Sequence, residues 1–303
     1  MVLSEQKFVT PLKVGLLIVA FAYFLFTLHQ TFMFTWIGEW EFLAPSNPQA
    51  ATWIFITDIQ AYVFLLFRFV AGIIAVSAAT LYFVKKGLPQ STTYKLLRAI
   101  IVFEGLYWLG LLTSGIWGML PTEYGFNVVF MLSTGIPCTV GSIGIPVSMF
   151  MLAYKLNSFK PANAAIKWAM IAGLFYALTL WLNNTGMWIT TVLTKGTDWL
   201  LSSPESLVSF VSAVFGLLAL VIYTGYFAKK SSGTYDWSQL KLGTIGALIT
   251  GLGMFFLWNY LTWIFFGGWN EWYAWILGHN LDLWMLSLPL VGLPLLFHKK
   301  TTN

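Results

Sequence analysis

The sequence predicts an all-α integral membrane protein, a single bundle of about eight transmembrane helices with both termini in the cytoplasm. Of its 303 residues, 58% are hydrophobic and only 9% are charged, whereas about a quarter of the residues of a typical soluble protein are charged. Its apolar runs are long enough for the roughly 20 residues that cross a bilayer core, and short polar segments separate them. We therefore expect a multi-pass protein of the cell membrane.

The first four predicted spans are bounded by lysines, prolines and turn-forming residues. The second is longer than a simple crossing requires, which favours a tilted helix. The fourth contains two Gly-Ile-Pro sequences, at 135–137 and 144–146. Such interruptions bend a helix and free backbone carbonyls, and in transporters they often lie near a binding site, although in a static bundle they merely allow close packing. The predicted bounds of these spans are 12–36, 53–84, 96–120 and 126–154.

The last four predicted spans follow the same plan. The sixth is preceded by Ser202-Ser203-Pro204, a pattern typical of a helix N-cap with proline in the first turn. It ends at Lys229-Lys230, and a Gly- and Ser-containing stretch leads to the seventh. The predicted bounds are 166–192, 207–228, 240–266 and 272–297.

The orientation follows from the distribution of positive charge. All 16 Lys and Arg residues except Arg68 and Lys195 precede odd-numbered spans or follow even-numbered ones. Cytoplasmic loops of membrane proteins are enriched in Lys and Arg, so both termini are predicted to be cytoplasmic. Because the lysines lie at helix ends, the net charge of +5 indicates topology and not nucleic-acid binding.

A layer of polar residues is predicted below the outer surface. His29 precedes Trp36 by seven residues and His279 follows Trp272 by seven, which places each histidine roughly 10 Å below the outer interface. Asp282 lies one turn deeper than His279 on the same helix face. Such groups normally face a bundle interior or water, although simple interhelical hydrogen bonds would also account for them. The other members of this candidate binding layer are Asp58, Asn259 and Asn183.

Three chemistries fit the histidine pair. His29 and His279 could be axial ligands of one b-type haem, could bind a metal ion together with an aspartate, or could handle protons beside a quinone or an ion path. Shared ligation by the two histidines requires the first and last spans to be neighbours in the bundle.

Two charges are predicted deeper in the membrane. Arg68 lies near the middle of the second span and Glu104 lies in the inner half of the third. An isolated charge there is strongly destabilising, so the two residues could form a structural ion pair. Alternatively, they could belong to a proton path or could anchor an anionic group.

We expect one of three roles from these features. The first is a membrane subunit of an electron-transfer (respiratory) complex that binds haem b or a quinol near the outer face, at most a non-catalytic or quinone-reactive part of an oxidoreductase. The alternatives are a transporter or channel for a small polar solute, and a structural anchor subunit. The expected partners are the lipid bilayer and other subunits on the outer face. No catalytic residue is identified, since no nucleophile arrangement or phosphate-binding loop is present.

Overall fold

The described part of the protein is entirely helical. The computed structural model describes residues 51–84, 90–119, 131–156, 162–198 and 204–228, together with single positions between 14 and 31 and between 245 and 250; side chains of 51–62 and a few other positions are not described. No strand occurs within these ranges. The helices are α2 (Ala51–Val84), α3 (Gln90–Met119), the π-helical turn η3 (Met131–Gly135), α5 (Ile136–Lys155), α6 (Ala162–Lys195) and α8 (Pro204–Ala228).

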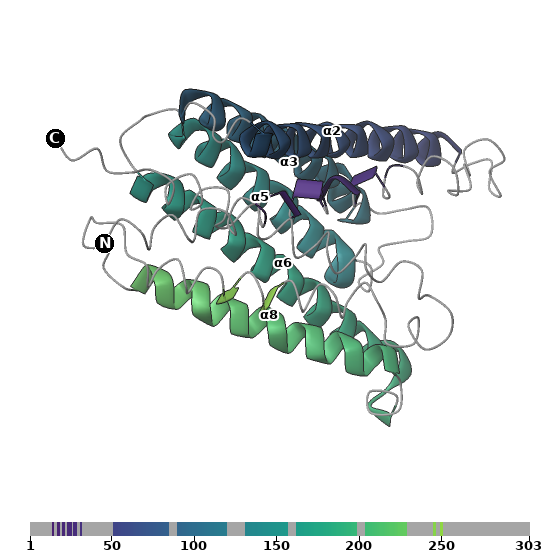
Figure 1. The fold of residues 1–303 in the computed structure, drawn as a ribbon. Coiled ribbons are helices and arrows are strands. Elements are labelled where there is room, and N and C mark those ends of the chain that lie inside the picture. The colour runs from purple at the N-terminus through teal and green to yellow at the C-terminus, as the bar shows by residue number, and fades with distance from the viewer. Residues whose placement is uncertain are drawn as a thin grey trace.

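The long helices lie side by side in the order of the chain (Figure 1). Helix α3 packs between α2 and α5, and α6 packs between α5 and α8. The described positions between 14 and 31 are also helical, and we call them the N-terminal helical residues. Two of them, Ala20 and Tyr23, join Ala71 and Ala75 of α2 in a small buried cluster. The prediction of an all-α fold is confirmed for the described residues.

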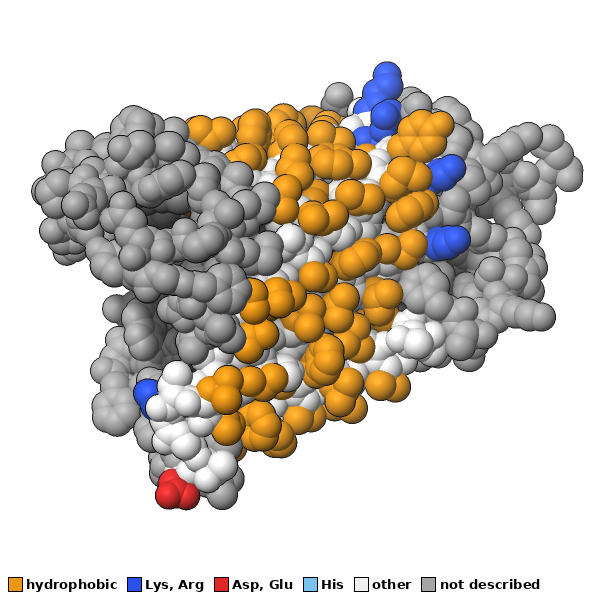
Figure 2. All heavy atoms as spheres, turned by 180° about the vertical axis from the view of Figure 1, so that it is seen from behind, with side chains coloured by type: hydrophobic (Ala, Val, Ile, Leu, Met, Phe, Trp, Pro, Cys, Tyr) orange, Lys and Arg blue, Asp and Glu red, His pale blue; other side chains and the backbone are white. Residues whose placement is uncertain are grey.

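Among the described helices, two are long and apolar enough to cross a membrane. The qualifying segments are Val63–Leu81 of α2 and Ser206–Gly225 of α8. Large apolar side chains such as Leu66, Leu218 and Val221 point outward from these helices. Figure 2 shows that such side chains cover a broad face, with most of the Lys and Arg side chains visible on it gathered at one end.

The positively charged end is a consequence of antiparallel packing. Lys95 lies in the second turn of α3, Lys155 is the last residue of α5, and Lys167 lies in the second turn of α6. Because α5 packs on both α3 and α6, these three ends meet on the same side. At its other end α6 carries Lys195, followed by the exposed Asp198.

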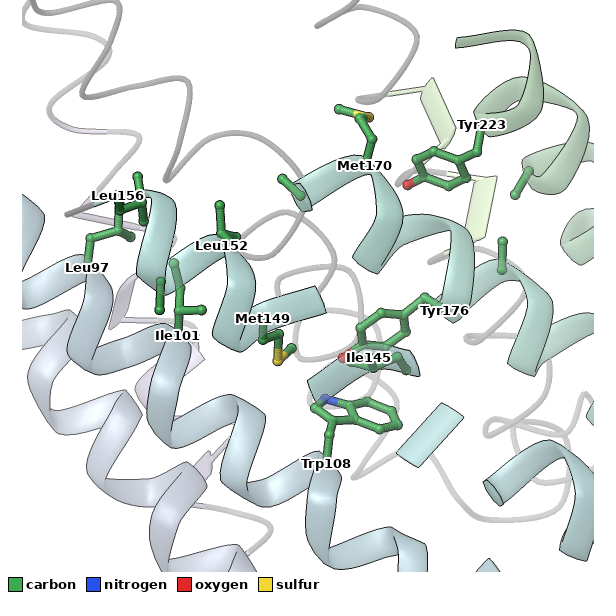
Figure 3. Packing of buried hydrophobic residues seen from close by; sticks show 14 of the residues in the cluster. Leu97, Ile101, Trp108, Ile145, Met149, Leu152, Leu156, Met170, Tyr176 and Tyr223 are labelled. Carbon is green, nitrogen blue, oxygen red and sulfur yellow. The ribbon is translucent and has the colours of Figure 1, made fainter. Parts of the chain in front are cut away.

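The main core is formed by α3, α5, α6 and α8 (Figure 3). Ile145, Met149 and Leu152 of α5 are fully buried in it, between residues of α3 and residues of α6. Glycine permits the closest approach of two helices: a methyl group added at Gly216 of α8 would lie 2.9 Å from the backbone nitrogen of Trp181 on α6.

The predicted fourth span is not one uniform helix. It contains the π-helical turn η3, and α5 begins directly after it with Pro137 near its N-terminus and Pro146 in its interior. Proline lacks the N–H that would bond to the preceding turn. Hydroxyl groups bond to backbone carbonyls nearby: Thr139 donates to the carbonyl of Gly135 at 2.8 Å, and Ser148 donates to that of Gly144. The Gly-Pro sequences thus coincide with a change in helix type and with an internal proline.

Several helices are longer than their predicted spans. Helix α3 begins at Gln90 where residue 96 was predicted, and α6 extends over Ala162–Lys195 where 166–192 was predicted. Hydropathy marks only the apolar part of a helix, and the polar residues that flank it continue in helical conformation. By contrast, α2 and α8 begin within three residues of the predicted bounds and end on them.

Candidate functional site: a buried ion pair between α2 and α3

Arg68 and Glu104 form an ion pair in the interior of the bundle. The Arg68 Nε donates to Glu104 Oε1 at 3.1 Å. Arg68 is 1% exposed and Glu104 2% exposed, so water does not screen the pair. The sequence prediction that these two charges are partners is confirmed.

A tyrosine from the N-terminal helical residues completes the carboxylate contacts. The Tyr23 hydroxyl donates a hydrogen bond to the same oxygen, Glu104 Oε1. The second oxygen, Oε2, is also buried, and no group in the described part of the chain donates to it. The carboxylate is therefore asymmetric, with two donors at one oxygen and none at the other.

The guanidinium group has an aromatic neighbour as well. The Arg68 Cζ lies 4.2 Å from the centroid of the Tyr107 ring, within the range of a cation–π interaction. Tyr107 meets Trp108 edge to face, with centroids 5.7 Å apart, and Trp108 meets Tyr176 of α6 in the same way at 4.7 Å. Figure 3 shows the Trp108 and Tyr176 rings directed toward each other across the core. Tyr107, Trp108 and Tyr176 therefore form a continuous series of ring contacts from the ion pair to α6.

Helix periodicity explains why these side chains converge. Glu104, Tyr107 and Trp108 are spaced by three and four residues, so they share one face of α3. Phe67 of α2 and Phe103 of α3, which precede the two charged residues in the sequence, contact each other with ring centroids 6.1 Å apart. The burial of Arg68 and Glu104 lowers the local dielectric, which strengthens the electrostatic interaction between them.

Other polar side chains are buried or partly buried on α6 and α8. The Asn183 Nδ2 contacts the sulfur of Met187 at 3.8 Å on its own helix. Asn184 is fully buried, and its Nδ2 donates to the carbonyl of Leu180 at 2.7 Å. The Asn184 Oδ1 is buried and accepts no hydrogen bond from the described residues. The hydroxyl of Ser212 on α8 is also buried and has no hydrogen-bond partner among them.

Most residues of the predicted outer polar layer lie outside the described part of the chain. His29, His279, Asp282 and Asn259 lie outside the described residues, so the haem, metal and quinone hypotheses for the histidine pair are untested. Asp58 lies in α2, and its side chain is not described. Asn183 is described and is half-buried. Among the residues that the structure describes, no three His, Cys, Asp or Glu side chains form a group that could hold a metal ion.

Sequence reasoning missed the aromatic members of the site. Tyr23, Tyr107 and Tyr176 were not predicted to contact the charges. For Tyr107 a signal existed, because it lies three residues after Glu104 and therefore on the same helix face. Tyr23 and Tyr176 are distant in the chain, and only the packing of the helices brings them to the pair.

Comparisons with protein-family models, with curated proteins and with solved structures found no match to this chain.

Proposed function

We propose that this chain is a multi-pass protein of the cell membrane that moves a small polar solute across the bilayer. The observation that carries the proposal is the fully buried Arg68–Glu104 pair, held inside the bundle by Tyr23 and Tyr107. Ionisable residues within membrane helices are rare and usually mark the paths of substrates, ions or protons.

The energetics of a buried ion pair favour a functional role over a purely structural one. Two charges removed from water incur several kcal/mol of desolvation each, and well-packed apolar residues often stabilise a protein as well or better. The Arg68 Nε donates to Glu104 Oε1, and no group among the described residues donates to the other carboxylate oxygen. A pair selected for stability alone would satisfy both oxygens.

Helix α5 supplies the element that could move. It follows a π-helical turn, contains Pro146, and packs against α3, which carries Glu104, and against α6. Discontinuous helices beside a buried charged site are typical of transporters, in which they separate or close around the solute. Eight spans, both termini in the cytoplasm and partner subunits on the outer face remain part of this proposal.

Uptake into proteoliposomes tests the transport role. The purified protein is reconstituted and offered labelled small polar solutes of different charge, beside protein-free liposomes. We expect uptake of at least one class in the wild type and its loss in Glu104→Gln and Arg68→Gln. Ser142→Ala on α5, which removes a buried hydroxyl that donates to the Thr139 carbonyl at 3.3 Å, is the control that should retain uptake. Equal uptake in the wild type and both charge variants would refute the proposal.

The electron-transfer role is a second proposal, favoured by the equal predicted depth of His29 and His279. It requires haem b or a quinone, and an optical spectrum of the oxidised and reduced protein tests the haem. A b-type spectrum that disappears in both His29→Ala and His279→Ala would support it. A colourless wild-type protein would leave no basis for haem ligation.

A further inference from the structure

One oxygen of the buried Glu104 carboxylate, Oε2, accepts no hydrogen bond from the described residues. We propose that Glu104 Oε2 is a reversible proton-binding site in the interior of the bundle, and that its protonation is coupled to solute movement. This inference rests on the transport role proposed above and names the coupling ion as a proton.

The first step is the asymmetry of the carboxyl group. Oε1 accepts hydrogen bonds from Tyr23 and Arg68, whereas Oε2 is buried and accepts none from the described residues. Buried polar atoms in proteins nearly always have a hydrogen-bond partner. A charged oxygen without one is unfavourable, and a proton bound at Oε2 removes the negative charge from that atom.

The second step is that Arg68 keeps a partner when Glu104 is neutral. Its guanidinium lies over the Tyr107 ring at 4.2 Å, and a desolvated cation–π interaction contributes about 2 kcal/mol. Protonation of Glu104 therefore does not leave an isolated buried cation. The contact of Arg68 with Tyr107 is thus compatible with both the carboxylate and the carboxylic acid form of Glu104. A site that alternates between these two forms requires such compatibility.

The third step is that the described surroundings of Oε2 suit a proton better than a divalent metal ion. Hard cations such as Ca²⁺ and Mg²⁺ need about six or more oxygen ligands. Among the described residues, the titratable and charged groups that face Glu104 are Tyr23, Arg68 of α2, Tyr107 of α3 and Tyr176 of α6. Helix α5 contributes the apolar Phe150 beside Gly105. The described residues thus offer no second carboxylate, and the guanidinium repels a metal ion. A proton needs only one oxygen.

The chemical step is a simple proton transfer. A proton from water on one side of the membrane binds to Oε2 and converts the carboxylate to a carboxylic acid. It later leaves to water on the other side and restores the carboxylate. No electron is transferred, and no other bond forms or breaks.

Infrared difference spectroscopy of the full-length protein in lipid tests the site without any solute. We expect a carboxylic-acid carbonyl band that appears as the pH is lowered from about 9 to about 4, an interval that includes both buried and ordinary glutamates. The band should shift in D₂O. Glu104→Gln should lose one carboxyl equivalent of this band. Asp198→Asn, which removes an exposed carboxylate at the end of α6, is the matched control and should retain the band.

A second variant guards against misfolding of Glu104→Gln. Tyr23→Phe removes the hydroxyl donor and keeps the carboxyl group, so the band should persist and should appear at a higher pH than in the wild type, because the charged form has lost a hydrogen bond. An unchanged band in both variants, or no protonating band in the wild type, would overturn the inference. If the Glu104 band titrates and no solute is taken up, the proton site stands and the transport role alone fails.

Discussion

Removal of one member of the buried ion pair gives the sharpest prediction on stability. Arg68→Met replaces the guanidinium with an apolar side chain and leaves Glu104 without its counter-charge. Loss of one partner of a buried pair typically costs about 3–5 kcal/mol. Because the two side chains are only 1% and 3% exposed, solvent screening does not reduce this value.

The geometry places the expected loss near the lower end of that range. The Arg68 Nε lies 3.1 Å from Glu104 Oε1, and Tyr23 continues to donate to the carboxylate when Arg68 is replaced. We therefore expect the free energy of unfolding to fall by about 3 kcal/mol near neutral pH. The deficit should shrink as the pH is lowered, since a protonated carboxyl group needs no counter-charge.

Reversible unfolding of the protein in mixed micelles measures this loss for Arg68→Met, Glu104→Leu and the double variant. The double variant should be close to the wild type or more stable, since it buries no charge. A coupling energy between the two sites below about 0.5 kcal/mol, the level of independent residues, would show that the two charges do not interact and would refute the reasoning.

Three further predictions concern other contacts. Gly216→Ala on α8 should destabilise the protein by about 1–3 kcal/mol, because the added methyl group meets the α6 backbone. Gly225→Ala on the same helix is the control: its added methyl group would have no atom within 4 Å, so the variant should be neutral or stabilising in the same unfolding assay. Ser212→Ala should be neutral or stabilising, since its buried hydroxyl makes no hydrogen bond in the described part of the chain; a loss above about 1 kcal/mol would contradict this. Tyr107→Leu should lower stability by about 2 kcal/mol through loss of the contact with Arg68, and the loss should vanish in an Arg68→Met background.

The sequence was sufficient to predict a helical protein and to suggest that Arg68 and Glu104 are partners. Hydropathy locates apolar segments well, which explains the close agreement for α2 and α8. It does not locate polar helix ends, so the starts of α3 and α6 were placed too late. It also does not distinguish a π-helical turn from an α-helical one, because both have the same composition.

The composition of the site was less predictable, since it depends on helix rotation. Asn183 and Asn184 are adjacent in the sequence, yet one is half-buried and the other fully buried. A weakly amphipathic helix such as α6 carries apolar residues on all sides, so its pattern does not show which face is inside. For the same reason the contact of Tyr23 with Glu104 could not be inferred from spacing.

The pairing of α2 with α3 also bears on how the protein is made. The two helices are consecutive and packed together, and the charges of Arg68 and Glu104 cancel at their interface. A charged residue at the centre of a helix raises the free energy of insertion by about 2.5–3.5 kcal/mol on biological scales. We expect the two helices to leave the translocon as one hairpin, in which neither charge meets lipid alone. In a glycosylation-reporter assay, α3 should therefore insert less efficiently by itself than behind α2, and equal efficiencies would show that insertion does not depend on the pair.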